Sequence, residues 1–156
     1  MSTQTFKATV EVGRDGRVIV EVPFDPDEVW GTKATHHLTG SMDGKGLRAV
    51  LEKEGDGYRF VLGPAWGRGC RIDDGQQVTV VLSPEGPQRA ELDPDFAAAL
   101  DAEPKAGEFF DSIAQFYRKA YLTYIGATKR SPEKRVARIA EVVGLLKAGV
   151  KQRPGT

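Results

Sequence analysis

The residues best suited to chemistry lie in the last third of the sequence, where tyrosines occur among arginines and lysines. Tyr117, Arg118, Tyr121 and Tyr124 fall on one predicted helix, and Arg118 and Tyr121 are three residues apart, so their side chains can share a face. Further basic residues follow at Lys129, Arg130, Lys134, Arg135 and Arg138. Tyrosine rings stack on bases and arginines pair with phosphates or carboxylates, so the pattern predicts a basic, aromatic-rich binding patch. A solvated helix face with its tyrosines in the core would carry the same pattern.

A second candidate site pairs Trp30 with Lys33. An ammonium group over an indole ring would form an aromatic and cationic pocket. The alternative is that Trp30 closes one end of a small β-barrel and that Lys33 is solvated, because a small barrel fills its interior with large side chains. The sequence leaves both alternatives open.

Candidates for metal binding or catalysis are few. His36 and His37 are adjacent, and neighbouring residues of a strand point to opposite faces, so the two rings cannot chelate one ion. Cys70 lies between two arginines, which favour a thiolate, but no histidine is close in sequence. The glycine-rich segments 40–46 and 63–69 match neither the P-loop motif GxxxxGK[ST] nor the dinucleotide-binding motif GxGxxG. We therefore expect no catalytic residue, metal or cofactor, and we favour a protein that is not an enzyme.

The composition limits the class of partner. The 156 residues include 22 basic and 22 acidic ones, and the zero net charge argues against a strongly electrostatic partner for the whole molecule. The charges are nevertheless separated, because residues 91–111 hold seven acidic residues and one lysine, and residues 112–156 hold ten basic and two acidic ones. We see neither a signal peptide nor a stretch long enough to cross a bilayer, so we expect a cytoplasmic protein with no membrane partner. The oligomeric state stays open.

Strand patterns occupy the first half of the chain. Alternating or β-branched segments occur at 6–12, 17–22, 32–38, 46–53, 57–62 and 77–82, with glycine-containing turns between them. Pro23 ends the second segment, and Asp25-Pro26 is a start signal for a short helix that contains Trp30. The pattern predicts a small six-stranded β-barrel, in which closure removes exposed strand edges.

Helix signals occupy the second half. Start signals occur at Asp93-Pro94, Pro104 and Ser131-Pro132, and a further helix is expected over 116–125. The sequence therefore predicts an α+β protein with a barrel domain over 1–83 and a linker over 84–92. Residues 93–150 are expected to form about four short helices that pack on the barrel, and 151–156 to form a disordered tail.

Several segments, in this order, resemble the bacterial YdeI/OmpD-associated, bacteriocin-protection-like family. The segments are VPFDPDEVWG, TGSMDG, DDGQQVTVVL, LDPDFAAAL, EFFDSI, FYRKAYLTYI and ATKRSPEKRVARIAEVVGLL. The resemblance implies a double-split β-barrel, similar to that of swapped-hairpin transcription factors and antitoxins, followed by a small helical region. It implies no reaction. The sequence departs from the family pattern at Ala34-Thr35-His36-His37 and over 63–71.

These observations lead to three hypotheses. The first is a non-enzymatic binding module for a small anionic ligand, a peptide or a protein partner. Its expected binding residues are Trp30, Lys33, Arg118, Tyr121, Lys129, Arg135 and Arg138. The second is a nucleic-acid-binding regulator that uses the basic helices, and it predicts an affinity that falls steeply with salt. The third is a hydrolytic enzyme that uses Cys70 or a carboxylate with one of the histidines.

Overall fold

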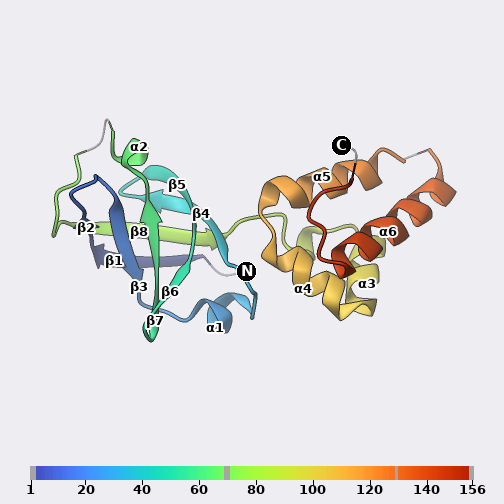
Figure 1. The fold of residues 1–156 in the computed structure, drawn as a ribbon, viewed down its shortest axis with the longest axis horizontal. Helices are drawn as coiled ribbons and strands as arrows, with labels where there is room; N and C mark the ends of the chain where they lie inside the picture. Colours follow the sequence, from blue (N-terminus) through green and yellow to red (C-terminus); the bar gives the residue numbers. More distant parts are fainter. Residues whose placement is uncertain (1–2, 69–70, 129, 155–156) are drawn as a thin grey trace. The chain divides into compact units, whose positions relative to one another are not determined.

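Strands fill the first part of the chain and helices the second (Figure 1). The protein is described by a computed structural model over residues 3–68, 71–128 and 130–154. The chain forms two units, the first made of Met1–Thr32 with His36–Pro84 and the second of Lys33–Thr35 with Glu85–Thr156. All eight described strands belong to the first unit, and helices α3 to α6 belong to the second. The predicted α+β class is therefore confirmed.

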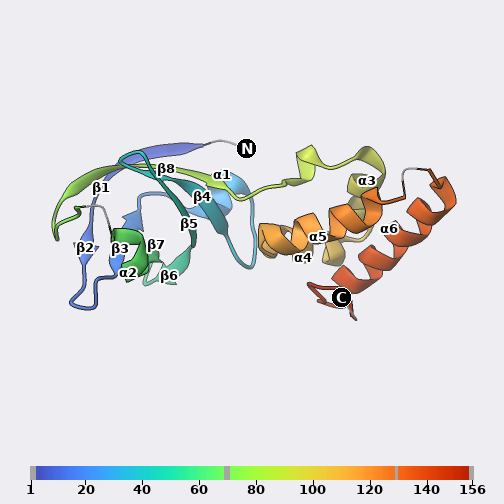
Figure 2. The same ribbon diagram turned by 90° about the horizontal axis from the view of Figure 1, so that it is seen from above.

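The strands of the first unit form two antiparallel sheets of four strands each. One sheet has the order β1–β8–β4–β5, with bounds Gln4–Thr9, Gln77–Pro84, His37–Met42 and Lys45–Val50. The other has the order β2–β3–β7–β6, with bounds Glu11–Val12, Val18–Val22, Gly57–Leu62 and Glu52–Glu54. Figure 2 shows β1 and β8 of the first sheet in one layer and β3 and β7 of the second sheet in another.

The chain passes from one sheet to the other at two corners. Val10 lies between β1 and β2, and Leu51 lies between β5 and β6. Both side chains are buried, and their backbone groups pair with neighbouring loops: Val10 N donates to Gln76 O at 2.9 Å, and Leu51 N donates to His36 O at 3.0 Å. The bends therefore leave neither amide without a partner.

The two corners explain why the strand count differs from the prediction. The predicted strands 6–12 and 46–53 each bend and contribute a strand to both sheets, so six segments become eight strands. In the part of the chain that the structure describes, the two sheets stay open, and the predicted closed six-stranded barrel is not confirmed. The predicted strand 32–38 is wrong, because β4 begins at His37 and Lys33–Thr35 belong to the second unit.

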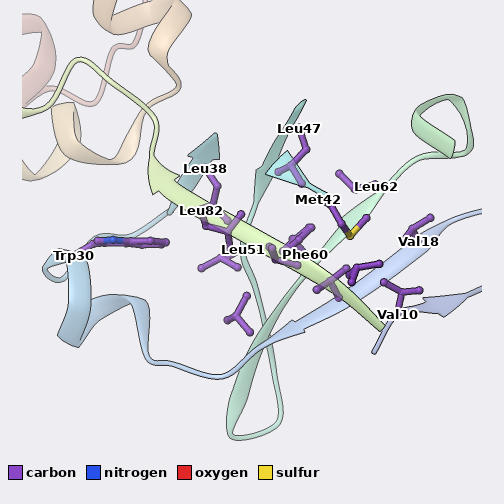
Figure 3. Packing of buried hydrophobic residues seen from close by; sticks show 14 residues of the cluster. Val10, Val18, Trp30, Leu38, Met42, Leu47, Leu51, Phe60, Leu62 and Leu82 are labelled. Atoms are coloured by element: carbon purple, nitrogen blue, oxygen red, sulfur yellow. The ribbon is translucent and has the colours of Figure 1, made fainter. Parts of the chain in front are cut away.

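Apolar side chains from both sheets fill the space between the layers. Phe60 and Leu82 are fully buried, and Figure 3 shows the side chains of the two sheets pointing toward one another. Trp30 is another large buried side chain. It is the last residue of the short helix α1 (Pro26–Trp30) and lies at one edge of this cluster. Alternation along each strand places these residues inward, as the sequence pattern indicates.

The second unit contains the four helices that the sequence predicts. They are α3 (Pro94–Ala102), α4 (Pro104–Ser112), α5 (Gln115–Gly126) and α6 (Pro132–Lys147), preceded by the 3-10 helix η1 (Arg89–Glu91). Ser131 caps α6, because its side chain accepts a hydrogen bond from Lys134 N. The four helices enclose a core of their own, with Phe96, Phe110 and Leu146 almost completely buried. The short helix α2 (Pro64–Gly67) lies in the first unit.

A close approach of β4 to β8 leaves no room for a side chain at Gly40 unless the backbone shifts. A Cβ atom on Gly40 would overlap the carbonyl oxygen of Val81, whereas one on Gly46, in the paired strand β5, would meet nothing nearer than 4.0 Å. We expect Gly40→Ala to lower the free energy of unfolding of the first unit by about 2–3 kcal/mol, because the backbone must move apart. Gly46→Ala is the matched control and is expected to change it by less than about 0.5 kcal/mol.

Urea denaturation followed by tryptophan fluorescence checks this prediction. Both tryptophans, Trp30 and Trp66, lie in the first unit, so the signal reports that unit alone. Equal midpoints for the two alanine variants would contradict the close approach.

Candidate functional site

The structure distributes the predicted binding residues over several places. Trp30 is in the first unit, 2% exposed, and its ring packs edge-on against Phe24 with the ring centres 5.1 Å apart. Lys33 belongs to the second unit. Lys129 lies outside the described residues, as does Cys70. The remaining four, Arg118, Tyr121, Arg135 and Arg138, are on α5 and α6.

Arg118 lies in the interior of the helical unit. It is 2% exposed, and its guanidinium donates to four backbone carbonyls. Nε donates to Ile113 O at 3.0 Å, and Nη2 donates to Asp111 O at 2.5 Å. Nη1 donates to Pro87 O at 2.8 Å and to Glu85 O at 3.3 Å. Arg118 thus joins the loop after β8 to the junction of α4 and α5.

Glu85, Gln88 and Lys33 complete a buried polar centre around Arg118. The Glu85 carboxylate accepts from Gln115 N at 2.8 Å and so caps α5, whose own N-cap residue, Ala114, has no acceptor. Gln88 donates to Glu85 O and accepts from Lys33 Nζ at 3.2 Å. Hydrogen bonds of this polar centre therefore link the loop after β8 to the start of α5 and to Lys33.

The electrostatics of the polar centre follow from burial. Burial lowers the pKa of Lys33, the nearby charge of Arg118 lowers it further, and Asp111 opposes the shift. Burial also lowers the pKa of Arg118, which the charges of Asp111 and Glu85 partly offset. The sequence analysis did not identify Glu85 or Gln88, because their partners lie about thirty or more residues away. The absence of a local cap at Ala114 is the signal that could have indicated a distant acceptor.

Arg135 is held by two carboxylates of the α3 start. Its Nε contacts Asp95 Oδ2 at 2.6 Å, and its Nη2 contacts Asp95 Oδ1 at 2.8 Å and Asp93 Oδ2 at 3.0 Å. These hydrogen bonds raise the pKa of Arg135, and the Arg135 guanidinium lowers the pKa of Asp95. A cavity of about 100 Å³ adjoins Arg135, lined also by Phe96 and Leu122. An anion entering it would have to replace a carboxylate that is already in place.

Three tyrosines of α5, Tyr117, Tyr121 and Tyr124, form what we call the tyrosine face, because spacings of four and seven residues place them on one side of the helix. Arg138 of α6 lies over Tyr124, with its Cζ 4.4 Å from the ring centre, and its Nη1 donates to Tyr124 O at 2.8 Å. The Tyr124 hydroxyl donates to Glu141 Oε1 at 2.5 Å. That hydrogen bond raises the pKa of Tyr124 and lowers the pKa of Glu141.

Residues 150–153, which we call the C-terminal segment, also contact the tyrosine face. The Tyr121 hydroxyl donates to Val150 O at 2.5 Å, and burial raises the pKa of that tyrosine. Lys151 Nζ lies 4.9 Å from the Tyr117 ring centre, and Arg153 Cζ lies 3.5 Å from that of Tyr124. These contacts differ from the disordered tail expected over 151–156. The sequence analysis missed Lys151 and Arg153, although Gly149, which follows the C-cap residue of α6, is a typical turn signal.

The two histidines are in the first unit and differ in their surroundings. His36 is 5% exposed, and its Nε2 lies 2.6 Å from Asp27 Oδ1, so the pair joins the start of β4 to α1. His37 is half-buried at the first position of β4. Across the described ranges, no group of three or more His, Cys, Asp or Glu side chains is arranged to hold a metal ion.

Residues 89–149 match the model of a protein family described as Bacteriocin-protection, YdeI or OmpD-Associated. The match extends from the start of η1 to Gly149, two residues after the end of α6, and so covers all four helices of the second unit. It confirms the family resemblance over this region. None of the curated proteins matches the chain. Among the described helices, none combines the length and the apolar character needed to span a bilayer.

Removing the Arg118 guanidinium should destabilise the helical unit strongly. We expect Arg118→Met to lower its free energy of unfolding by about 3 kcal/mol or more, because four buried or half-buried carbonyls lose their donor. Thermal unfolding followed by circular dichroism at 222 nm measures this, since most helical residues are in this unit. Lys119→Met, an exposed neighbour on α5, is the matched control and should leave the midpoint within about 2 °C.

The Arg135–Asp95 pair should contribute stability only above acidic pH. Because the folded-state pKa of Asp95 is lowered, its contribution is present above the ordinary value of 3.8 and disappears as pH falls through the folded-state pKa. The carboxylate is half exposed, so we expect Asp95→Asn to cost about 0.5–1 kcal/mol at pH 7. The asparagine oxygen can still accept from Phe96 N. Melting curves of both proteins should converge near pH 2; a constant difference would contradict the ion pair.

Proposed function

We propose that this protein, whose helical unit belongs to the YdeI/OmpD-associated, bacteriocin-protection family, is a non-enzymatic binding module for an acidic segment of a protein partner. The proposed binding surface consists of the tyrosine face, Arg138 and the C-terminal segment. The family match itself supports no specific ligand, so the proposal depends on the geometry of this surface.

The observation that carries the proposal is the stacking of two guanidinium groups on one ring. Arg138 and Arg153 both lie on Tyr124, at 4.4 and 3.5 Å from its centre. An aromatic ring beside a guanidinium restricts its position, and guanidinium groups recognise carboxylates through the N–H groups at their edge. Lys151 on Tyr117 adds a third cation along the same helix. Arg118 is buried against four carbonyls and Arg135 is held by two aspartates, whereas Arg138 and Arg153 each lie against the Tyr124 ring.

An exposed aromatic residue supports a protein partner in particular. Phe116 is 65% exposed, and its ring packs edge-on against Tyr117 with the centres 5.2 Å apart. Aromatic side chains and arginines are enriched at protein interfaces, where an apolar anchor supplies affinity and charges supply orientation. We therefore expect the partner segment to carry an apolar residue among its carboxylates.

The barrel type of the first unit and the cellular location stay proposals. The bent pairs β1–β2 and β5–β6 support our proposal that the first unit is an open relative of the double-split barrel. A cytoplasmic location stays a prediction. The nucleic-acid alternative stays a hypothesis, because Glu141, 3.5 Å from Arg153, repels phosphates and carboxylates alike.

Binding of a labelled acidic peptide, Glu-Glu-Phe-Glu-Glu-Leu, tests the proposal by fluorescence anisotropy. We expect the affinity to fall as salt rises, and Arg138→Gln and Arg153→Gln each to weaken binding about fivefold, equal to about 1 kcal/mol. Lys119→Gln removes the same charge from the opposite side of α5 and should change the affinity less than twofold.

Three outcomes would contradict this function. One is no binding by the wild-type protein at low salt. Another is equal weakening by Lys119→Gln, which would indicate only general charge attraction. A third is tighter binding of a single-stranded oligonucleotide to the same surface, which would favour the nucleic-acid alternative.

A further inference from the structure

We infer that the tyrosine face, together with Glu141, is a receptor for a short basic segment of a partner protein, and that the C-terminal segment of this chain is its intramolecular occupant. Lys151 and Arg153 cover this surface in the structure, and the proposed partner segment would take the place of these two side chains. This receptor role does not depend on the acidic partner proposed above.

The end of α6 directs the C-terminal segment onto this face. Gly149 has a φ of 76°, which favours glycine, and Gly149 N donates to Leu146 O at 3.0 Å. Val150 N donates to Leu145 O at 2.9 Å, which completes the two hydrogen bonds of a Schellman motif. The chain therefore leaves the helix in one fixed direction, back toward α5 (red in Figure 1).

The C-terminal segment contacts all three tyrosines of the tyrosine face. Val150 meets Tyr121 through its carbonyl, Lys151 meets Tyr117, and Arg153 meets Tyr124. The seven residues from Tyr117 to Tyr124 rise about 10.5 Å along the helix, and two residues of extended chain span about 6.8 Å. The long lysine and arginine side chains cover the difference. The face thus fits two cations two residues apart in an extended segment.

The chemistry of these contacts identifies the class of ligand. The faces of tyrosine rings attract ammonium and guanidinium groups, and Glu141 adds a carboxylate 3.5 Å from the Arg153 Nε. The Tyr121 hydroxyl binds a backbone carbonyl, which every peptide offers. None of these contacts requires that the segment belong to the same chain. A partner with the pattern Lys-x-Arg therefore presents the same groups.

The position of the C-terminal segment determines the sign of the charge on this surface. With the C-terminal segment in place, the surface presents Lys151 and Arg153; with the segment displaced, it presents three tyrosines and Glu141. A covalently attached segment competes at a high effective concentration. Access for a basic partner is therefore expected to depend on displacement of residues 150–153.

The test uses the full-length chain with Lys151→Ala and Arg153→Ala, which removes both cations and leaves α5 and α6 unchanged. The probe is the peptide acetyl-Val-Lys-Gln-Arg-amide, and the readout is the shift of the Tyr117, Tyr121 and Tyr124 amide signals in NMR titrations. We expect a Kd on the order of 1–10 mM for the double variant and at least about tenfold weaker binding to the wild type. Adding Glu141→Gln to the double variant should weaken binding at least about threefold.

Two controls separate the inference from general charge effects. Lys119→Ala with Lys134→Ala removes the same charge but keeps the C-terminal segment, so this variant should bind as weakly as the wild type. The peptide acetyl-Val-Gln-Gln-Gln-amide should not shift the tyrosine signals. Well-dispersed spectra establish that each variant is folded.

Absence of tyrosine shifts in the folded double variant at about 20 mM peptide would overturn the inference. Equal binding by the double variant and the wild type would overturn it too, because the segment would then not occupy the site. The acidic peptide is tested on the wild-type protein, and the basic peptide is tested on the variant that lacks Lys151 and Arg153. Failure of one proposal can therefore be distinguished from failure of the other.

Discussion

The helical unit depends on one buried guanidinium. Arg118 donates to carbonyls at the end of α4 and in the loop after β8, where no helix or strand ladder provides a donor. A buried carbonyl without a partner costs about as much as a lost hydrogen bond, so these segments can meet only around such a donor. Glu85 then caps α5. Because the same residue fixes a loop and two helices, the surfaces built on α5 are positioned by it.

Local signals predicted the helices and turns well, and non-local pairing was predicted poorly. Ser131-Pro132 fixes the start of α6, and the Asp43-Gly44 turn between β4 and β5 has positive φ at both residues, as that dipeptide favours. Val10, by contrast, continues a regular alternation, and nothing near it in sequence indicates that the strand changes sheets there. The bend is determined by its partner Gln76 on a distant loop. Pairing of this kind cannot be read from periodicity.

The candidate site shows the same division. The sequence analysis paired Arg118 with Tyr121 and did not single out the face that Tyr117, Tyr121 and Tyr124 share, although helix geometry alone determines that face. The roles of the arginines depend on distant residues, so the sequence could not separate them. Arg118 is buried against carbonyls up to 33 residues away, and Arg135 pairs with carboxylates about forty residues away. Arginines that look equivalent in a basic stretch therefore perform structural or surface roles according to their tertiary partners.

Charge separation along the chain does not carry over to the folded helical unit. Asp93 and Asp95, from the acidic stretch, neutralise Arg135 from the basic one. The cations that remain on the tyrosine face come from α6 and from the C-terminal segment, and the latter reach α5 only because Gly149 turns the chain. A replacement of Gly149 by a residue with a Cβ disfavours that turn without touching any tyrosine. The electrostatic character of this surface is therefore controlled by a backbone conformation, and not by the number of charged residues in the sequence.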